Sequence, residues 1–145
     1  MFTPGSHSTL PVSLLVYGAA SLVHFIHNAE LIAHYPGLPT SWTREGVYLA
    51  WLGMTAVGVC GWWVLSRGYP VAGLLVLAGY ALLGLDSLGH YALAPFSAHS
   101  TAMHVTILLE VAAGASVLVL ALRLIVARAD ARPLNTGGRP RDGRG

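Results

Sequence analysis

The residues best suited to chemistry are histidines and acidic residues that interrupt long apolar stretches. The first group lies between His24 and His34 and combines three imidazoles with an amide and a carboxylate. Ionisable side chains are costly inside an apolar segment of membrane length and usually have a function there. Imidazole and carboxylate are also ligands that Zn, Fe and Cu accept, so a transition-metal site is the first hypothesis. Two further groups follow, one made of Asp86 and His90 and the other of His99, His104 and Glu110.

Composition places the chain among integral membrane proteins. Of its 145 residues 54% are hydrophobic and only 10% are charged, whereas soluble domains usually carry about 25% charged residues. All the basic residues are arginines, most of them near the C-terminus. We read this distribution as an orientation signal and expect no nucleic-acid partner. The single cysteine, Cys60, excludes an intrachain disulfide and a cysteine-based metal motif.

The apolar pattern predicts an all-α protein, an integral membrane four-helix bundle. Each apolar stretch is long enough to cross the hydrocarbon core as a helix, and helices satisfy their backbone groups internally. Small residues recur in the later stretches, which favours close helix packing. A short polar segment, residues 1–9, precedes the bundle, and an Arg-, Gly- and Pro-rich tail, residues 128–145, is expected to be disordered. The four spans are expected at about residues 10–33, 46–65, 70–93 and 101–127, within a single domain from 10 to 127.

Arginine placement predicts that both termini are cytoplasmic. Arg67 and the arginine-rich tail lie on one side of the predicted bundle, and Arg44 is the basic residue of the other side. The positive-inside rule then assigns the termini to the cytoplasm of a multi-pass plasma (inner) membrane protein. Its expected partners are the lipid bilayer and either a second copy of the chain or a larger membrane complex.

With this orientation the ionisable groups gather in the outer half of the membrane. At about 1.5 Å per residue, His24 and Glu110 both lie about 14 Å below the outer boundary, and His27 and Asp86 about 10 Å below it. Asp86 and His90 are four residues apart, so an α-helix would direct both toward one centre. We therefore expect the first, third and fourth spans to build one site.

The expected ligands are the deepest of these groups. Three tyrosines could donate hydrogen bonds to them: Tyr35, Tyr80 and Tyr91. Three residues would support the site or line its rim: Asn28, His34 and His99. Seven residues would bind the transition metal or orient its ligands: His24, His27, Glu30, Asp86, His90, His104 and Glu110.

Several functions fit this set. These seven side chains are more than the ligands of one tetrahedral metal site. They therefore predict either one metal ion with supporting groups around its ligands or a dinuclear non-haem centre. Such a centre would serve a metal-dependent oxidoreductase or hydrolase, or a protein that handles metal. The main alternative is an electron-transfer subunit that binds haem b between two histidines, or a quinone. A third is a structural or partner-binding role without a cofactor.

Overall fold

The computed structural model describes residues 6–131, and over that range the secondary structure is entirely helical. Four stretches are long and apolar enough to cross a membrane, which confirms the prediction of an all-helical fold with four helices of that length. The third stretch, Pro70–Leu93, consists of the helix α3 (Pro70–Leu85), a 3₁₀ turn (Asp86–Gly89) and the short helix α4 (His90–Leu93). The elements are α1 (Ser6–Glu30), η1 (Ile32–His34), α2 (Arg44–Ser66), α3 (Pro70–Leu85), η2 (Asp86–Gly89), α4 (His90–Leu93), η3 (Phe96–Ala98) and α5 (Thr101–Asp130).

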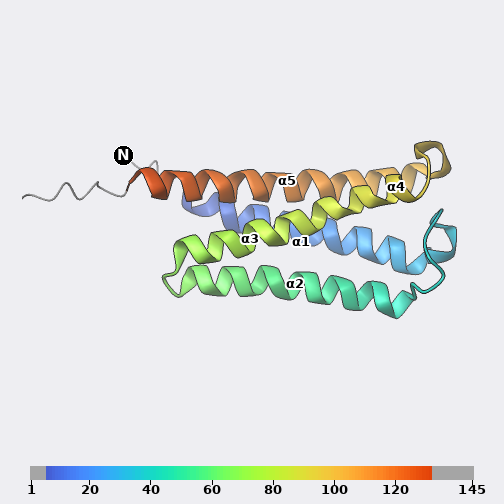
Figure 1. The fold of residues 1–145 in the computed structure, drawn as a ribbon, viewed down its shortest axis with the longest axis horizontal. Coiled ribbons are helices and arrows are strands. Elements are labelled where there is room, and N and C mark those ends of the chain that lie inside the picture. Colours follow the sequence, from blue (N-terminus) through green and yellow to red (C-terminus); the bar gives the residue numbers. More distant parts are fainter. Residues whose placement is uncertain (1–5, 132–145) are drawn as a thin grey trace, which may run out of the picture.

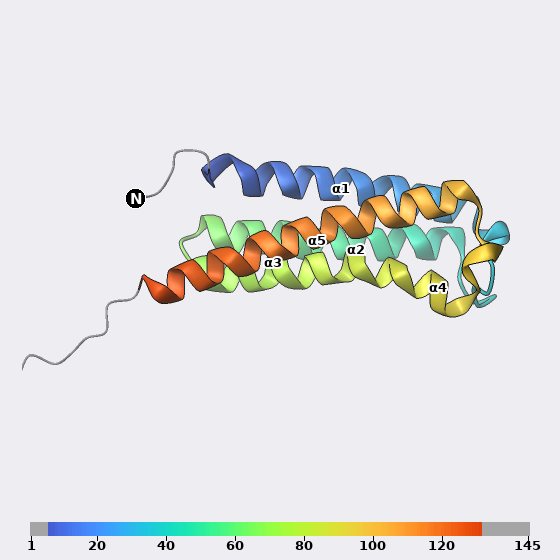
Figure 2. The same ribbon diagram turned by 90° about the horizontal axis from the view of Figure 1, so that it is seen from above.

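The long helices form an antiparallel four-membered ring. α1 contacts α2 and α5, and α3 contacts the same two neighbours. α1 begins and α5 ends at one end of the bundle, and the turn between α2 and α3 lies there too (Figure 1). α5 runs obliquely, so that its beginning lies beside the end of α1 (Figure 2). We call the opposite end, formed by residues 31–43 and 86–100, the histidine end.

Local sequence fixes where these helices begin. The Thr43 side chain accepts a hydrogen bond from the Gly46 N–H at the start of α2, and Ser100 accepts one from the Met103 N–H at the start of α5. Pro70 occupies the first turn of α3, where its missing N–H costs no hydrogen bond. Caps at both α2 and α5 position the polar residues of the histidine end.

The helices differ from the predicted span limits by up to four residues: α1 runs from Ser6, inside the predicted N-terminal segment, to Glu30, and α5 continues to Asp130. Part of the predicted tail, residues 128–130, is therefore helical. The rest of the disorder prediction, residues 132–145, lies outside the described residues, as do residues 1–5 of the N-terminal segment. Membrane insertion and the cytoplasmic location of the termini stay predictions.

Glycine allows α3 to pack closely on the end of α2. A Cβ atom at Gly73 would lie 2.5 Å from the backbone nitrogen of Leu65 and 2.6 Å from its Cα. Real Cβ atoms do not approach backbone so closely, so this contact requires glycine. Gly79 in the same helix has no such neighbour, because an added Cβ there meets no heavy atom within 4 Å.

We expect Gly73→Ala to destabilise the bundle by about 1–3 kcal/mol, because the methyl group forces α2 and α3 apart. The measurement is the free energy of unfolding in mixed detergent micelles titrated with SDS. Gly79→Ala is the matched control and should be neutral or stabilise by up to about 1 kcal/mol through helix propensity. Equal stability of the two variants would contradict the close α2–α3 contact.

Candidate functional site

Glu110 lies at the centre of the polar groups and is fully buried on α5. The Ser87 hydroxyl donates a hydrogen bond to Glu110 Oε2, and His24 Nε2 lies 3.7 Å from the same oxygen. On its other side, His24 Nδ1 lies 3.3 Å from Thr106 Oγ1. The carboxyl group thus has neighbours from α1 and η2. The Thr106 hydroxyl, which belongs to α5 like Glu110, orients the His24 imidazole.

Asn28 and His90 form a second pair, nearer the histidine end. Asn28 Nδ2 lies 3.2 Å from His90 Nε2. An amide nitrogen is only a donor, so Nε2 accepts and the proton of the neutral ring is on Nδ1. His90 Nδ1 and Asn28 Oδ1 are both buried and have no hydrogen-bond partner among the described residues. The pair therefore offers one free donor and one free acceptor.

Tyr35 fills the space between the histidines. It is buried, and its ring centroid lies 4.9 Å from that of His90 and 6.5 Å from that of His24. Its hydroxyl lies 2.8 Å from His27 Nδ1. Burial raises the pKa of Tyr35 to about 12, because a phenolate would lose its hydration there. Tyr35 thus ties the segment after α1 to the core as a neutral hydrogen-bonding group.

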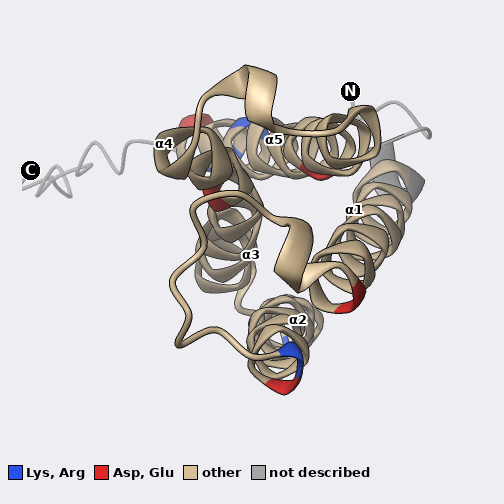
Figure 3. Cartoon of the chain, turned by 90° about the vertical axis from the view of Figure 1, so that its right-hand side faces the viewer, with Lys and Arg blue, Asp and Glu red and all other residues tan. Residues whose placement is uncertain are grey.

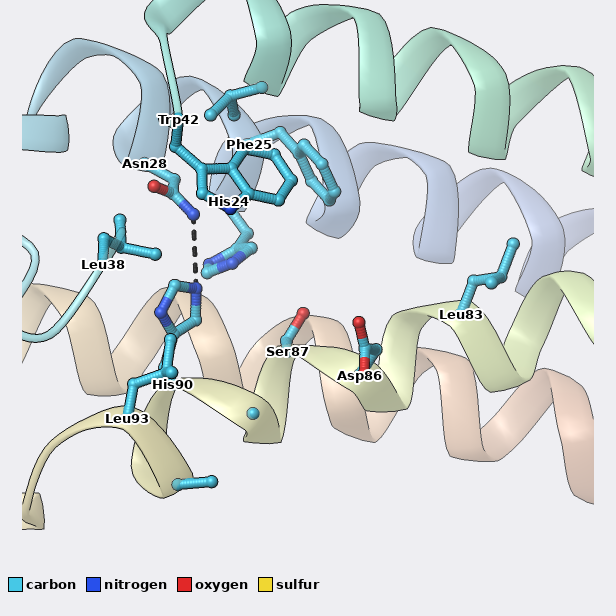
Figure 4. Close-up of a pocket in the computed structure, with 13 residues that line it drawn as sticks. His24, Phe25, Asn28, Leu38, Trp42, Leu83, Asp86, Ser87, His90 and Leu93 are labelled. Carbon is cyan, nitrogen blue, oxygen red and sulfur yellow. Dashed lines mark hydrogen bonds between the residues drawn. The ribbon is translucent and has the colours of Figure 1, made fainter. Parts of the chain in front are cut away.

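A cavity of about 410 Å³ adjoins these residues. His24, Asn28 and His90 are among its polar lining residues, and Figure 4 shows Asn28 and His90 joined beside it. Phe25 and Trp42 are among its apolar walls. The volume lies within the range of small-molecule sites, about 300–1,000 Å³. The remaining lining residues are Leu38, Val47, Leu83, Asp86, Ser87, Gly89, Ala92 and Leu93.

The 3₁₀ turn η2 decides which side chains face inward. In a 3₁₀ helix, residues three apart are eclipsed, whereas residues four apart differ by about 120°. Ser87 and His90 are three apart and both are buried, while Asp86 is exposed. Asp86 and His90 both line the cavity, but only His90 is buried there, and their joint role at one metal centre stays a prediction.

Other predicted residues lie at the edge of the site. His99, expected at the rim, is buried, and its Nδ1 donates to the Pro95 carbonyl at 3.1 Å. His104 stacks on Phe96 with 3.8 Å between ring centroids, and its Nδ1 lies 2.9 Å from the Tyr91 hydroxyl. His34 is exposed.

Glu30 is held elsewhere, near the surface. Its Oε1 accepts hydrogen bonds from Arg44 Nε at 2.9 Å and from the Tyr48 hydroxyl at 2.6 Å. This half-exposed ion pair joins the end of α1 to the start of α2. Figure 3 looks onto the histidine end, where few charged residues appear. Glu30 therefore serves the α1–α2 contact.

The structure places His24 beside both His90 and Glu110. Asp86 lines the same cavity as His24 and His90, whereas His27, Glu30 and His104 make separate contacts. Across residues 6–131 no group of three or more His, Cys, Asp or Glu side chains is arranged to hold a metal ion. Zn, Fe or Cu binding stays a prediction, and so does haem b.

Hydroxyl partners are the main residues that the sequence reasoning did not single out. Ser87 and Thr106 contact Glu110 and His24 from neighbouring elements. Their signal was available, because Ser and Thr inside apolar spans commonly bond across helices. Of the three predicted tyrosine donors, Tyr35 and Tyr91 have their hydroxyls within hydrogen-bond distance of histidines.

No model of a known protein family matches the chain, and no curated protein or solved structure matches it.

We expect Glu110→Leu to destabilise the protein by about 1–3 kcal/mol, because the buried Ser87 hydroxyl loses its acceptor and the His24 imidazole loses the carboxyl group beside it. Glu110→Gln keeps an oxygen at this place and should lose less. Glu45→Leu, at an exposed glutamate of α2, is the control and should change stability little. SDS unfolding of the three variants measures this, and an unchanged Glu110→Leu protein would contradict the contact set.

The raised pKa of Tyr35 predicts an alkaline loss of stability. Because the folded protein holds this proton more tightly than the unfolded chain does, its contribution is complete below pH 10 and declines from there to about pH 12. Tyr35→Phe should be less stable at neutral pH but lose less stability over that alkaline range. Unfolding transitions at a series of pH values test this, and parallel losses in both proteins would refute a buried Tyr35 hydroxyl.

Proposed function

We propose that this chain is a multi-pass membrane protein that binds a small molecule of the quinone class in the cavity at its histidine end. The observation that carries the proposal is the free donor of His90 beside the free acceptor of Asn28. A quinone ring has carbonyl oxygens that accept from an imidazole N–H. Its reduced form has hydroxyls that donate to an amide oxygen, so one pair of residues can hold both forms.

The cavity walls support a flat ligand that is largely apolar. Phe25 and Trp42 present rings to the cavity, and Leu38, Val47 and Leu83 add aliphatic surface. Ligand sites typically combine such walls with a few polar groups that fix the orientation. A neutral ring with two oxygens matches this surface better than a charged ligand does.

His24 connects this cavity to Glu110. Its ring lines the cavity, and its Nε2 faces the buried carboxyl group. Carboxyl and imidazole groups inside a membrane commonly hold and pass protons. In this proposal Glu110 and His24 hold one proton close to the ligand, and any electron donor or acceptor belongs to a partner protein.

A transition metal on His24 and Glu110 is the second candidate, favoured by the 3.7 Å separation between Nε2 and Oε2. Elemental analysis and a visible spectrum of the purified protein separate the candidates. A quinone site needs no stoichiometric metal. A Soret band would instead identify haem b, and stoichiometric Zn, Fe or Cu that is lost in His24→Ala would identify the metal site.

The direct test titrates dimethoxy-methyl-benzoquinone, which has no side chain, into protein in lipid nanodiscs and follows tryptophan quenching. We expect saturable quenching that Trp42→Phe largely removes, because Trp42 lines the cavity. Asn28→Leu and His90→Leu should each raise the Kd about tenfold, since a lost hydrogen bond of about 1.4 kcal/mol corresponds to that factor.

His34→Ala is the matched control, because His34 lies at the same end of the bundle but is exposed. It should bind the benzoquinone as the wild type does. Non-saturable quenching, or equal affinities for the wild type and Asn28→Leu, would overturn the proposal.

A further inference from the structure

A second cavity, of about 450 Å³, lies along the seam between α1 and α2. Its walls are mainly apolar, and the Tyr80 ring of α3 lies among them. Leu15, Val59 and Trp62 are exposed, so the cavity is an open groove on the outside of the bundle. The same two helices also wall the first cavity, at the histidine end.

The two cavities lie on one continuous stripe of each helix. On α1 the lining residues Pro11, Leu15, Gly18 and Leu22 of the groove continue to Phe25 of the first cavity. These positions are three or four apart and therefore share a helical face.

The stripe on α2 has the same spacing. Trp51, Thr55, Gly58 and Trp62 line the groove, and Val47 of the first cavity lies one turn before Trp51. From Val47 to Trp62 the seam is about 22 Å long at about 1.5 Å per residue. Both cavities thus adjoin the same α1–α2 seam, with the groove on the side away from the histidine end.

We propose that the ligand of the first cavity carries a long apolar chain, and that this chain lies in the α1–α2 groove. This inference rests on the proposed function and narrows its substrate class to quinones with a polyprenyl chain. The absence of a side chain at Gly18 keeps the groove open. The space there is empty enough that an added Cβ would meet only the Tyr80 hydroxyl, at 4.0 Å. Trp51 Nε1 and Thr55 Oγ1 are buried without a partner among the described residues, and prenyl double bonds offer them weak π acceptors.

The test compares two probes, the chain-free dimethoxy-methyl-benzoquinone and the same ring with a farnesyl chain. Both are titrated into protein in nanodiscs, with concentrations corrected for partition into the lipid. The wild type should bind the farnesyl probe at least about tenfold more tightly, because apolar contact along several turns of the seam adds binding energy.

A Cβ at Gly18 meets no backbone atom within 4 Å, so the Gly18→Leu side chain can occupy the groove. It should remove this preference while leaving the affinity for the chain-free ring unchanged. Gly53→Leu is the matched control, because Gly53 is exposed on α2 and a Cβ there meets no heavy atom within 4 Å. It should retain the full preference for the farnesyl probe.

Each contrary result has its own meaning. Equal wild-type affinities for the two probes, or a preference that Gly18→Leu retains, would overturn the groove inference and leave the head-group site standing. Gly18→Leu could also change the mass of the protein particle while the wild type shows no preference for the farnesyl probe. That result would assign the groove to contact with a second copy of the chain and overturn the inference. Failure of both probes to bind would overturn the proposed function, and the groove inference with it.

Discussion

A carboxyl group buried within an apolar helix bundle has to find its hydrogen-bond partners on neighbouring helices. Glu110 meets this constraint in part: Oε2 accepts a hydrogen bond from Ser87 and lies 3.7 Å from His24 Nε2, while Oε1 is buried without a partner among the described residues. These contacts join α1, η2 and α5 at one level of the bundle. The inward direction of His24 follows from the same contacts, and so does the polar side of the cavity.

The 3₁₀ turn η2 is the local structure that allows these side chains to meet. It interrupts the third span after Leu85 and changes the angular spacing of the following residues. Ser87 then reaches Glu110, and His90 reaches Asn28 one turn further on. Short 3₁₀ stretches within helices often accompany functional sites, and here the stretch places two polar groups in adjacent layers.

Glycine determines where space is filled and where it stays open. At Gly73 and Gly84 neighbouring atoms occupy the place of a side chain, so α3 packs closely on α2 and on Tyr17 of α1. At Gly18 the space is open and becomes part of the α1–α2 groove. The same residue type therefore supports a tight contact on one side of the bundle and an open seam on another.

The sequence predicted the helices well, because span length and hydropathy depend on composition along the chain. It also placed His24 and Glu110 at matching depth, and the structure brings them to 3.7 Å. The rotation of each helix about its own axis, which decides where its side chains point, was harder to predict. Asp86 is exposed at the first residue of η2 although it also lines the cavity, and Glu30 turns to Arg44 because a charged partner is within reach there. His27 and His104 are held by tyrosine hydroxyls, contacts between segments that spacing along one helix does not reveal.

The claim that depends most on these contacts is that His90 and Asn28 hold the ligand head group. Nitrogen-15 NMR of histidine-labelled protein in nanodiscs, with His90→Leu to assign the signal, tests it at the atom concerned. The account predicts that dimethoxy-methyl-benzoquinone shifts the Nδ1 resonance of His90 toward a stronger hydrogen bond and leaves that of exposed His34 in place. An unchanged His90 resonance at saturating benzoquinone would contradict it.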